Sequence, residues 1–381
     1  MKQAVIAGAG ISGLTAARML AQAGYQVTIL EKRNHIGGNV YDYLEDGILV
    51  HKYGPHLFHT KMRQVTKFVQ QFAAFFPYEH HVLGEVQGKL VPIPFNFRSI
   101  DELFPFAQAE HLRRVLSAAY PAGDSVPVLE LRRHPNQEIR ELAEFVYQNV
   151  FFGYTKKQWG KPPQELDASV LGRVPVRMSY DSRYFTDEFQ MMPQQGYTKM
   201  LECMADHPDI FIRFGCEARS CLKICDTQIL FDGERLEGPV IYTGSIDELF
   251  DYKYGRLPYR SLDFILEKRN QQQAQPVVQI NYPNRFAYTR TSEYKLLQKE
   301  QVPDRTILMY EYPKKCMPGD IPYYPEETKE NRDCYNRYQV LADKVQNLYL
   351  SGRLARYQYC NMDAAIYHAM QLAQKIIEKE N

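Results

Sequence analysis

Three glycines near the N-terminus have the spacing of a turn that binds a dinucleotide. Gly8, Gly10 and Gly13 form the run G-A-G-I-S-G, directly after the apolar residues 4–7. The first permits a tight turn, the second lets the backbone approach a pyrophosphate, and the third lets a following helix pack closely on the strand. Glu31, at the end of the next strand-like run, can accept hydrogen bonds from ribose hydroxyls. The pattern predicts a dinucleotide-binding βαβ unit; a glycine-rich turn without a ligand is the alternative.

Two further features indicate which dinucleotide binds. A second glycine pair, Gly37-Gly38, follows soon after Glu31, an arrangement typical of flavin-binding folds and less so of NAD dehydrogenases. Near the C-terminus the strand-like residues 348–350 lead into Arg353, and a helix is expected from about Met362. Its N-terminus could stabilise the negative charge of a reduced flavin. FAD is therefore the predicted cofactor; a C-terminal helix that only packs is the alternative.

Two histidines and seven cysteines raise the question of a metal. His56 and His59 stand in the run P-H-L-F-H-T, but no third ligand lies nearby in the sequence. The cysteine number is odd, no C-x-x-C pair occurs, and the cluster Cys216, Cys221 and Cys225 has no histidine at ligand spacing. We predict no metal site and expect reduced, buried thiols.

Composition narrows the function classes. The chain has 381 residues, of which 45% are hydrophobic and 24% charged, and this balance excludes collagen-like, coiled-coil and largely disordered proteins. A formal net charge of +1 gives no overall basic field that would attract nucleic acid or an anionic membrane. No apolar run approaches the ~18 residues of a membrane span. Because the N-terminus also lacks a signal-peptide layout, we expect a cytoplasmic protein.

The elements that must position these residues alternate along the chain. Strands are predicted at 4–7, 27–30, 240–244, 277–282, 306–312 and 348–350, and helices at 14–23, within 101–148 and at 362–377. The nucleotide-binding fold therefore starts early with this βαβ unit, is interrupted by a helical insertion and by strands, and is completed by the last forty residues. We expect interleaved domains.

Long motifs then resemble one family from end to end, in order. They are E-K-R-N-H-I-G-G-N (31–39), H-K-Y-G-P-H-L-F-H-T (51–60), G-Y-T-K-K-Q-W-G (153–160), R-V-P-V-R (173–177), R-Y-F-T-D (183–187), Y-T-R-T-S-E-Y-K (288–295), P-Y-Y-P (322–325) and S-G-R-L-A-R-Y-Q-Y (351–359). They resemble the bacterial UDP-galactopyranose mutases.

The resemblance implies an isomerase that interconverts the pyranose and furanose forms of UDP-galactose and supplies furanose donors for surface polysaccharide. It implies covalent catalysis by FAD, active when reduced, without net redox change. The implied fold class is α/β: a Rossmann-like FAD-binding domain with an inserted helical bundle and a twisted antiparallel β-sheet. The implied boundaries are 1–85, 200–248 and 325–381 for the FAD-binding domain, 98–172 for the bundle, and 86–97, 173–199 and 249–324 for the sheet. The implied partner is a nucleotide-diphosphate hexose, and a homodimer is left open.

Site residues carry over one at a time. The resemblance implies that Arg173 and Arg290 bind the diphosphate as catalytic residues and that His59 tunes the flavin. Planar guanidinium groups bind such oxygens bidentately. Expected cofactor contacts are Gly8, Gly10, Ser12, Gly13, Glu31, Lys32, Gly38, Asn39, His56, Leu57, Arg353, Asn361 and Met362. Expected substrate contacts are His80, Tyr154, Trp159, Arg173, Tyr184, Phe185, Arg290, Tyr324 (with Tyr323 as the alternative), Arg353 and Tyr359.

Two positions depart from the family pattern. Asn361 stands where the family usually has an acidic residue, and His80 stands within E-H-H-V where an Asn-Ser-Pro-like run is common. Both leave the sugar open, so a dTDP-fucopyranose mutase of the same mechanism is an alternative. His59 keeps the galactose-type residue, which argues mildly against an N-acetylated sugar. A flavin amine-oxidase-like oxidoreductase and a non-catalytic nucleotide-sugar-binding homologue are the other classes.

Overall fold

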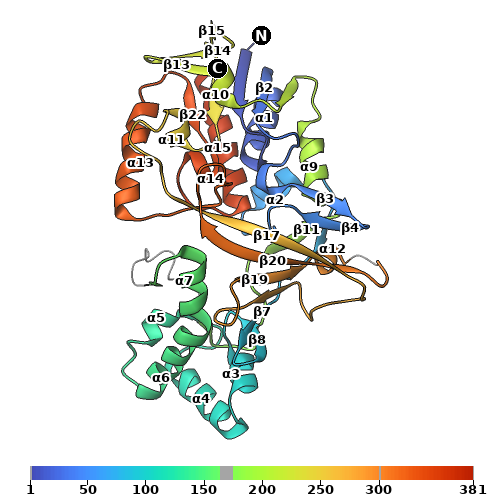
Figure 1. Cartoon of the computed structure of the whole chain (residues 1–381), viewed down its shortest axis with the longest axis vertical. Coiled ribbons are helices and arrows are strands. Elements are labelled where there is room, and N and C mark those ends of the chain that lie inside the picture. The colour runs from blue at the N-terminus through green and yellow to red at the C-terminus, as the bar shows by residue number, and fades with distance from the viewer. Residues whose placement is uncertain (1, 164–174, 300–301, 381) are drawn as a thin grey trace.

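A parallel five-stranded sheet forms the upper part of the molecule (Figure 1). The computed structural model describes residues 2–163, 175–299 and 302–380. The strand order is β12 (Ile210–Phe214), β2 (Tyr25–Glu31), β1 (Lys2–Ala7), β16 (Val240–Tyr242) and β22 (Leu348–Leu350), with every neighbouring pair parallel. The strands predicted at 4–7, 27–30, 240–244 and 348–350 are confirmed in this sheet.

Both faces of this sheet are covered. Ala4 and Ile6 of β1 pack with helices α1 (Ile11–Gln22), α9 (Gly196–Ala205) and α15 (Met362–Glu380). Val5 and Ala7 point to the other face, against the small sheet of β13 (Leu222–Cys225), β14 (Gln228–Phe231) and β15 (Glu234–Arg235). Burial on both faces explains why these strands read as continuous apolar runs. The predicted helices at 14–23 and 362–377 are confirmed.

A seven-stranded sheet crosses the middle of the molecule (Figure 1). Its order is β21 (Tyr324–Pro325), β17 (Tyr259–Arg269), β20 (Thr306–Lys315), β19 (Arg290–Glu293), β18 (Gln279–Asn281), β7 (Val82–Val86) and β8 (Lys89–Ile93). Neighbours are antiparallel except for the parallel pair β18 and β7. The strands expected at 277–282 and 306–312 are part of it.

Helices form the lower part (Figure 1). They are α3 (Phe97–Leu103), α4 (Phe106–Ala119), α5 (Val128–Leu131), α6 (Gln137–Val146), a π-helical turn η2 (Tyr147–Phe152) and α7 (Gly153–Trp159). Leu116 and Val146 pack with Val82, Val91 and Phe95 in one core. The inserted helices are therefore confirmed, and they fold onto the β7–β8 hairpin. The predicted 98–172 span includes residues 164–172, which lie outside the described residues.

Shorter elements connect these three parts. They are η1 (Gly38–Val40), β3 (Asp42–Glu45), β4 (Ile48–His51), β5 (Phe58–Thr60), α2 (Arg63–Val69), β6 (Phe75–Pro77), β9 (Ser125–Pro127), β10 (Pro175–Arg177), β11 (Phe189–Pro193), α10 (Ala218–Cys221), α11 (Ile246–Leu249), α12 (Tyr294–Gln298), α13 (Lys329–Ala342) and α14 (Gly352–Ala355). The mixed α/β fold class is confirmed, whereas the domain boundaries stay a prediction.

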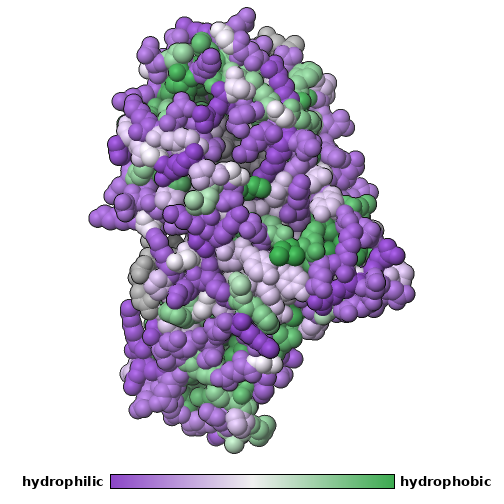
Figure 2. Space-filling model, in the orientation of Figure 1, coloured by the Kyte–Doolittle hydropathy of each residue, from purple (hydrophilic) through white to green (hydrophobic). Residues whose placement is uncertain are grey.

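The surface corrects one expectation. All seven cysteines are free, but Cys203 and Cys225 are exposed and the other five are only partly buried, so the prediction of buried thiols was wrong. The faces of α9 and β13 that carry these two side chains point to solvent, which a count of cysteines does not reveal. Hydrophilic residues cover most of the face seen in Figure 2. Among the described residues, no helix is long and apolar enough to cross a bilayer.

Candidate active site

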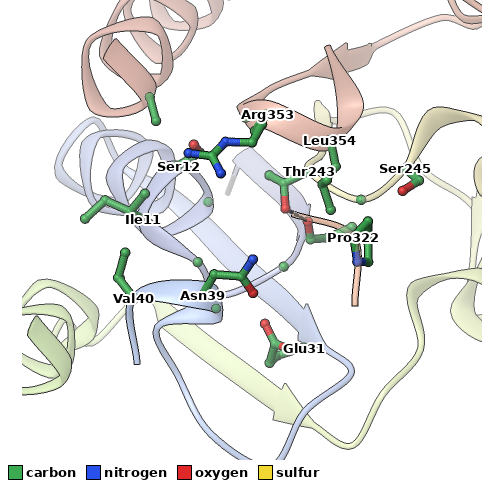
Figure 3. Close-up of a pocket in the computed structure, with 18 of the residues that line it drawn as sticks. Ile11, Ser12, Glu31, Asn39, Val40, Thr243, Ser245, Pro322, Arg353 and Leu354 are labelled. Carbon is green, nitrogen blue, oxygen red and sulfur yellow. Dashed lines mark hydrogen bonds between the residues drawn. The ribbon is translucent and has the colours of Figure 1, made fainter. Parts of the chain in front are cut away.

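A deep cleft opens where the parallel sheet meets its flanking loops. It holds about 1270 Å³ free of protein atoms, part of it open to solvent. In Figure 3, Glu31 and Asn39 come from the N-terminal segments on one side, while Arg353 and Leu354 come from the C-terminal segment on the other. Of the predicted cofactor residues, the cleft is lined by Gly8, Gly10, Ser12, Gly13, Glu31, Lys32, Gly38, Asn39, His56, Arg353, Asn361 and Met362. Leu57 does not line it and packs against the core instead.

The glycine turn has the geometry that its sequence predicts. Gly8 has φ +106°, where other residues are strained, and a Cβ on Gly13 would lie 2.0 Å from the Gly8 carbonyl oxygen. A Cβ on Gly10 would meet nothing closer than Gly38 Cα at 3.8 Å. Gly10 is the N-cap of α1 and no side chain caps the helix, so its first N–H groups are available at the cleft. Gly10 therefore keeps space for an approaching anion, and Gly13 keeps helix and strand in contact.

Glu31 lies where the second strand reaches the cleft. Its carboxylate is buried and accepts hydrogen bonds from the Ala9 N–H (2.7 Å) and the Arg33 N–H (2.9 Å). Arg33 donates from Nη2 to Asn39 Oδ1 at 2.8 Å, while its Nη1 is buried without a partner. The carboxylate keeps lone pairs for further donors. The acidic side chain, the free guanidinium nitrogen and the glycine turn fit the ribose and pyrophosphate of a dinucleotide.

The far end of the cleft is formed by His56, Arg353 and the start of α15. Arg353 donates to the backbone oxygens of Tyr323 (3.1 Å) and Cys360 (2.8 Å), which fixes its guanidinium at the cleft wall. His56 Nδ1 lies 2.8 Å from the Gly54 carbonyl, which can only accept, so Nδ1 carries the proton. Burial lowers the pKa of His56 to about 3, so the ring is neutral and Nε2 is an acceptor. The cleft thus runs from one helix N-terminus to another.

Two glycine variants separate the turn's roles. We expect Gly10→Ala to fold normally but to bind FAD more weakly, because the new methyl group occupies cleft space. Overpacking of this kind costs about 1–3 kcal/mol, or roughly 5- to 150-fold in Kd. Gly13→Ala should instead lower the thermal unfolding midpoint, because its Cβ overlaps the Gly8 carbonyl. Titration of apoprotein with FAD and thermal unfolding measure the two effects; equal FAD affinity in Gly10→Ala and wild type would contradict the placement.

Arg290 is held beside the cleft by a buried acid. It lies directly opposite Glu311 in the β19–β20 register, and its Nε is 3.3 Å from Glu311 Oε1. The Glu311 side chain is only 3% exposed. Burial raises the pKa of Glu311, and the Arg290 guanidinium opposes that shift. Arg290 Nη2 also donates to the Tyr154 hydroxyl. The pair holds the guanidinium in place, and the Arg290 side chain as a whole is 22% exposed.

Aromatic rings surround Arg353, which lines the cleft. The Arg353 guanidinium carbon lies 5.5 Å from the Tyr324 ring centroid and 4.8 Å from that of Tyr359. The Trp159 and Tyr324 centroids are 6.0 Å apart. The Tyr359 hydroxyl donates to Asn361 Oδ1 at 3.2 Å. Burial raises the pKa of Tyr324 above its ordinary value, so its phenol stays a neutral donor. Arginines and neutral phenols converging in this way suit a diphosphate.

A second group collects around His59. Its Nδ1 lies 2.8 Å from Asp187 Oδ2, and its ring stacks on Phe185 with centroids 3.6 Å apart. His80 contacts Tyr184 and Phe185 at centroid distances of 5.6 and 6.0 Å. His80 is 2% exposed, and burial lowers its pKa to about 3, so this ring is neutral. Within the described residues no group of three or more His, Cys, Asp or Glu side chains could hold a metal ion.

The structure therefore brings the predicted residues together in a cleft and two adjoining clusters. Arg173 lies outside the described residues. Sequence reasoning missed several cleft residues: Arg33, Val40, Glu217, Thr243, Ser245, Glu248, Pro322 and Leu354. It also missed Glu311 and Asp187, which hold the predicted Arg290 and His59. Thr243 had a usable signal, since it directly follows β16 at the carboxyl edge of a parallel sheet.

Fold and site together define a dinucleotide-binding α/β protein with a cluster of arginines and tyrosines at the cofactor cleft. The UDP-galactopyranose mutase family pattern matches residues 149–359, and an NAD(P)-binding Rossmann-like domain pattern matches residues 6–72. A UDP-galactopyranose mutase of Mycoplasma pneumoniae is 38% identical over 98% of this chain and 96% of its own length. A dTDP-fucopyranose mutase of Escherichia coli is 35% identical over 99% of both chains.

A solved structure of reduced UDP-galactopyranose mutase has the same fold, with a TM-score of 0.70 and 17% identity over 100% of this chain and 96% of that one. The chain belongs to the UDP-galactopyranose mutase family. The family resemblance read from the motifs is confirmed, as are the Rossmann-like fold and the mutase class of enzyme.

Proposed function

We propose that the protein interconverts the pyranose and furanose forms of UDP-galactose, using reduced FAD held in the cleft. The observation that carries this proposal is the placement of Arg290 and Arg353, with their ring of tyrosines, directly beside a cleft shaped for a dinucleotide. A diphosphate bound there would place its sugar between the two arginines and the flavin end of the cleft. When bound in the cleft, reduced flavin would supply the nucleophile for the anomeric carbon.

The chain's own residues hold the leaving group. Ring contraction requires the anomeric carbon to lose its nucleotide diphosphate and to regain it later. Arg290 would stabilise the diphosphate charge, with Tyr154 and Tyr324 adding neutral hydrogen bonds, and we assign the same role to Arg173. Because the diphosphate stays bound, its return is effectively intramolecular. His59, positioned by Asp187 and Phe185, would lie near the flavin and tune it.

The test is the dependence on flavin reduction. The purified protein should be yellow, and it should convert UDP-galactopyranose after dithionite treatment and not as the air-oxidised form. Product is measured by separating the two nucleotide sugars. Equal turnover by oxidised enzyme under air would sink the mechanism. An amine-oxidase-like oxidoreductase would instead consume substrate by oxidation, and a binding-only homologue would retain substrate without turnover under reducing conditions.

A second candidate substrate is dTDP-fucopyranose, favoured by the E. coli relative named above and by the buried, bulky His80. The mechanism would be the same, since a 6-deoxy sugar keeps the anomeric carbon and the 4-hydroxyl. For either sugar, we propose that the product is a furanose donor for surface polysaccharide and that the enzyme acts in the cytoplasm. A homodimer is the assembly we propose to test.

A further inference from the structure

Helix α7 carries two of the predicted substrate residues, Tyr154 and Trp159. Tyr154 reaches Arg290, and Trp159 lies against Tyr324. In Figure 1 the helix stands between the lower helices and the middle sheet. The helix continues from α6 and η2 without a break in helical backbone, so the preceding turns fix its start. Its C-terminal end, which closes at Gly160, needs another anchor to the sheet. Two cations provide that anchor, the partly buried Lys157 and the buried Arg260, and the activity proposed above uses neither of them.

Lys157 ties α7 to the loop that precedes β19. Its ammonium group donates to the backbone oxygens of Tyr282, Phe286 (2.9 Å) and Tyr288 (3.1 Å). All three donors of the ammonium are therefore used, and none of these three acceptors is a carboxylate. Burial lowers the pKa of Lys157 to about 8. The loop leads directly into Arg290, so one side chain joins the segment that bears Tyr154 to the segment that bears Arg290.

Arg260 makes the reciprocal connection from the sheet. Its Nε donates to the Gln158 carbonyl at 2.9 Å and its Nη2 to the Lys157 carbonyl at 3.3 Å. These carbonyls are at the C-terminus of α7, where a cation is favoured. Arg260 is 7% exposed and pairs with Tyr324 in the β17–β21 register. It therefore links the end of α7, next to Trp159, with the strand that presents Tyr324.

The backbone contact at the start of α7 is equally close. A Cβ on Gly153 would lie 2.1 Å from Asn284 Oδ1 and 2.6 Å from the Pro283 carbonyl oxygen. The loop 282–288 therefore contacts α7 at two places: at Gly153, where the helix starts, and at Lys157, near its end. An Asn284 side-chain N–H also donates to the Asn149 carbonyl at 3.2 Å. The contacts leave little freedom for α7 to slide along the sheet.

We propose that Lys157 and Arg260 are positioning residues that lock α7 onto the seven-stranded sheet and so set the spacing between Trp159, Tyr154 and the diphosphate residues. Neither cation needs to touch substrate. Without them, α7 would move relative to the sheet, and the substrate would meet a wider cleft. The activity readout of this inference rests on the proposed function, whereas the locked position of Trp159 does not.

Trp159 is the sole tryptophan of the chain, so its fluorescence reports the position of α7. In Lys157→Met we expect acrylamide to quench Trp159 more strongly than in wild type, and KM for the nucleotide sugar to rise about tenfold, the size of one lost charge-assisted hydrogen bond. The kcat should change much less. Lys156→Met is the matched control, because Lys156 is exposed on the same helix, and it should behave like wild type. Lys157→Arg should recover part of the loss.

Each outcome decides the inference. Wild-type quenching and KM in Lys157→Met would overturn it, as would equal effects in Lys156→Met. If Lys157→Met does not fold, Arg260→Met provides the same two readouts from the sheet side. Increased quenching in these variants, combined with no mutase activity in wild type, would support the lock and reject the proposed function. Mutase activity in wild type, combined with unchanged quenching in these variants, would support the proposed function and reject the lock.

Discussion

Replacing Arg290 by methionine should lower kcat/KM for the nucleotide sugar by roughly 10- to 150-fold, because charge-assisted hydrogen bonds to a diphosphate contribute about 1.5–3 kcal/mol each. FAD should remain bound, since Arg290 does not line the cofactor cleft. The measurement is initial rate under reducing conditions, with the flavin absorbance as the check on cofactor content. We expect Arg173→Ala to act in the same direction, on the strength of the family resemblance.

The buried acid beside Arg290 makes the single variant ambiguous by itself. Removing Arg290 leaves the Glu311 carboxylate buried without its cation, a change that costs about 3–5 kcal/mol in stability. The double variant Arg290→Met/Glu311→Gln removes that charge and should recover much of the thermal stability but not the activity. If the double variant also regained near-wild-type turnover, the loss would be structural and the diphosphate would bind elsewhere.

Much of the fold could be predicted because apolar runs, turn glycines and helical spacing in the sequence indicate the same elements. Residues 4–7 are apolar, end in Gly8, and are followed by helical spacing; the structure has β1, the turn and α1 in that order. The same holds at 348–350 and in the C-terminal helix. The hairpin β7–β8 was harder, because its residues pack with the inserted helices while the edge of β7 pairs with β18, which is distant in the sequence. Periodicity within one segment does not show which distant partner completes a core.

The site residues also fall into two groups: those set by local backbone geometry could be predicted, and those that act on distant partners could not. Glycines 8, 10 and 13 lie in the cleft because local backbone geometry requires them there. Glu311 and Asp187 were not predicted, because each acts on a residue of another segment. Glu311 lies opposite Arg290 on the neighbouring strand, and Asp187 contacts His59 from the loop before β11. An acid in an alternating strand looks like a surface residue until its partner is known. Lys157 is similar, since its acceptors are backbone carbonyls that no sequence pattern marks.

The second large effect that we expect is the difference in kcat/KM between galactopyranose and its 6-deoxy analogue, carried by the same nucleotide. We expect faster conversion of UDP-galactopyranose than of the 6-deoxy sugar on the same nucleotide, because most of the motifs match galactose enzymes. A site built to bind a hydroxyl rejects the analogue that lacks it by up to ~10⁴–10⁵, since its own polar groups are left unpaired, whereas an apolar pocket rejects an added hydroxyl by only about 10². The comparison is therefore asymmetric.

We expect His80 to determine whether the site binds the 6-hydroxyl or presents an apolar pocket to the 6-position. Its pKa near 3 makes it neutral at working pH, and its Nδ1 lies 3.3 Å from the Tyr78 hydroxyl, so part of its hydrogen-bonding capacity is already used inside the protein. A neutral ring packed against Tyr184 and Phe185 mainly fills space. His80→Asn should therefore shift the ratio of kcat/KM values toward the sugar that carries the 6-hydroxyl. Tyr78→Phe keeps the volume and is the control.

The ratio of kcat/KM for the two sugars, measured in wild type and in His80→Asn, distinguishes a fucose-type from a galactose-type enzyme. A fucose-type enzyme would still convert UDP-galactopyranose slowly, because an apolar pocket discriminates weakly, and His80→Asn would narrow its preference. A galactose-type enzyme would use the 6-deoxy sugar very poorly in both forms. A clear wild-type preference for the 6-deoxy sugar would overturn our choice and make His80 the residue that excludes the hydroxyl, and an unchanged ratio in His80→Asn would place the 6-position elsewhere in the cleft.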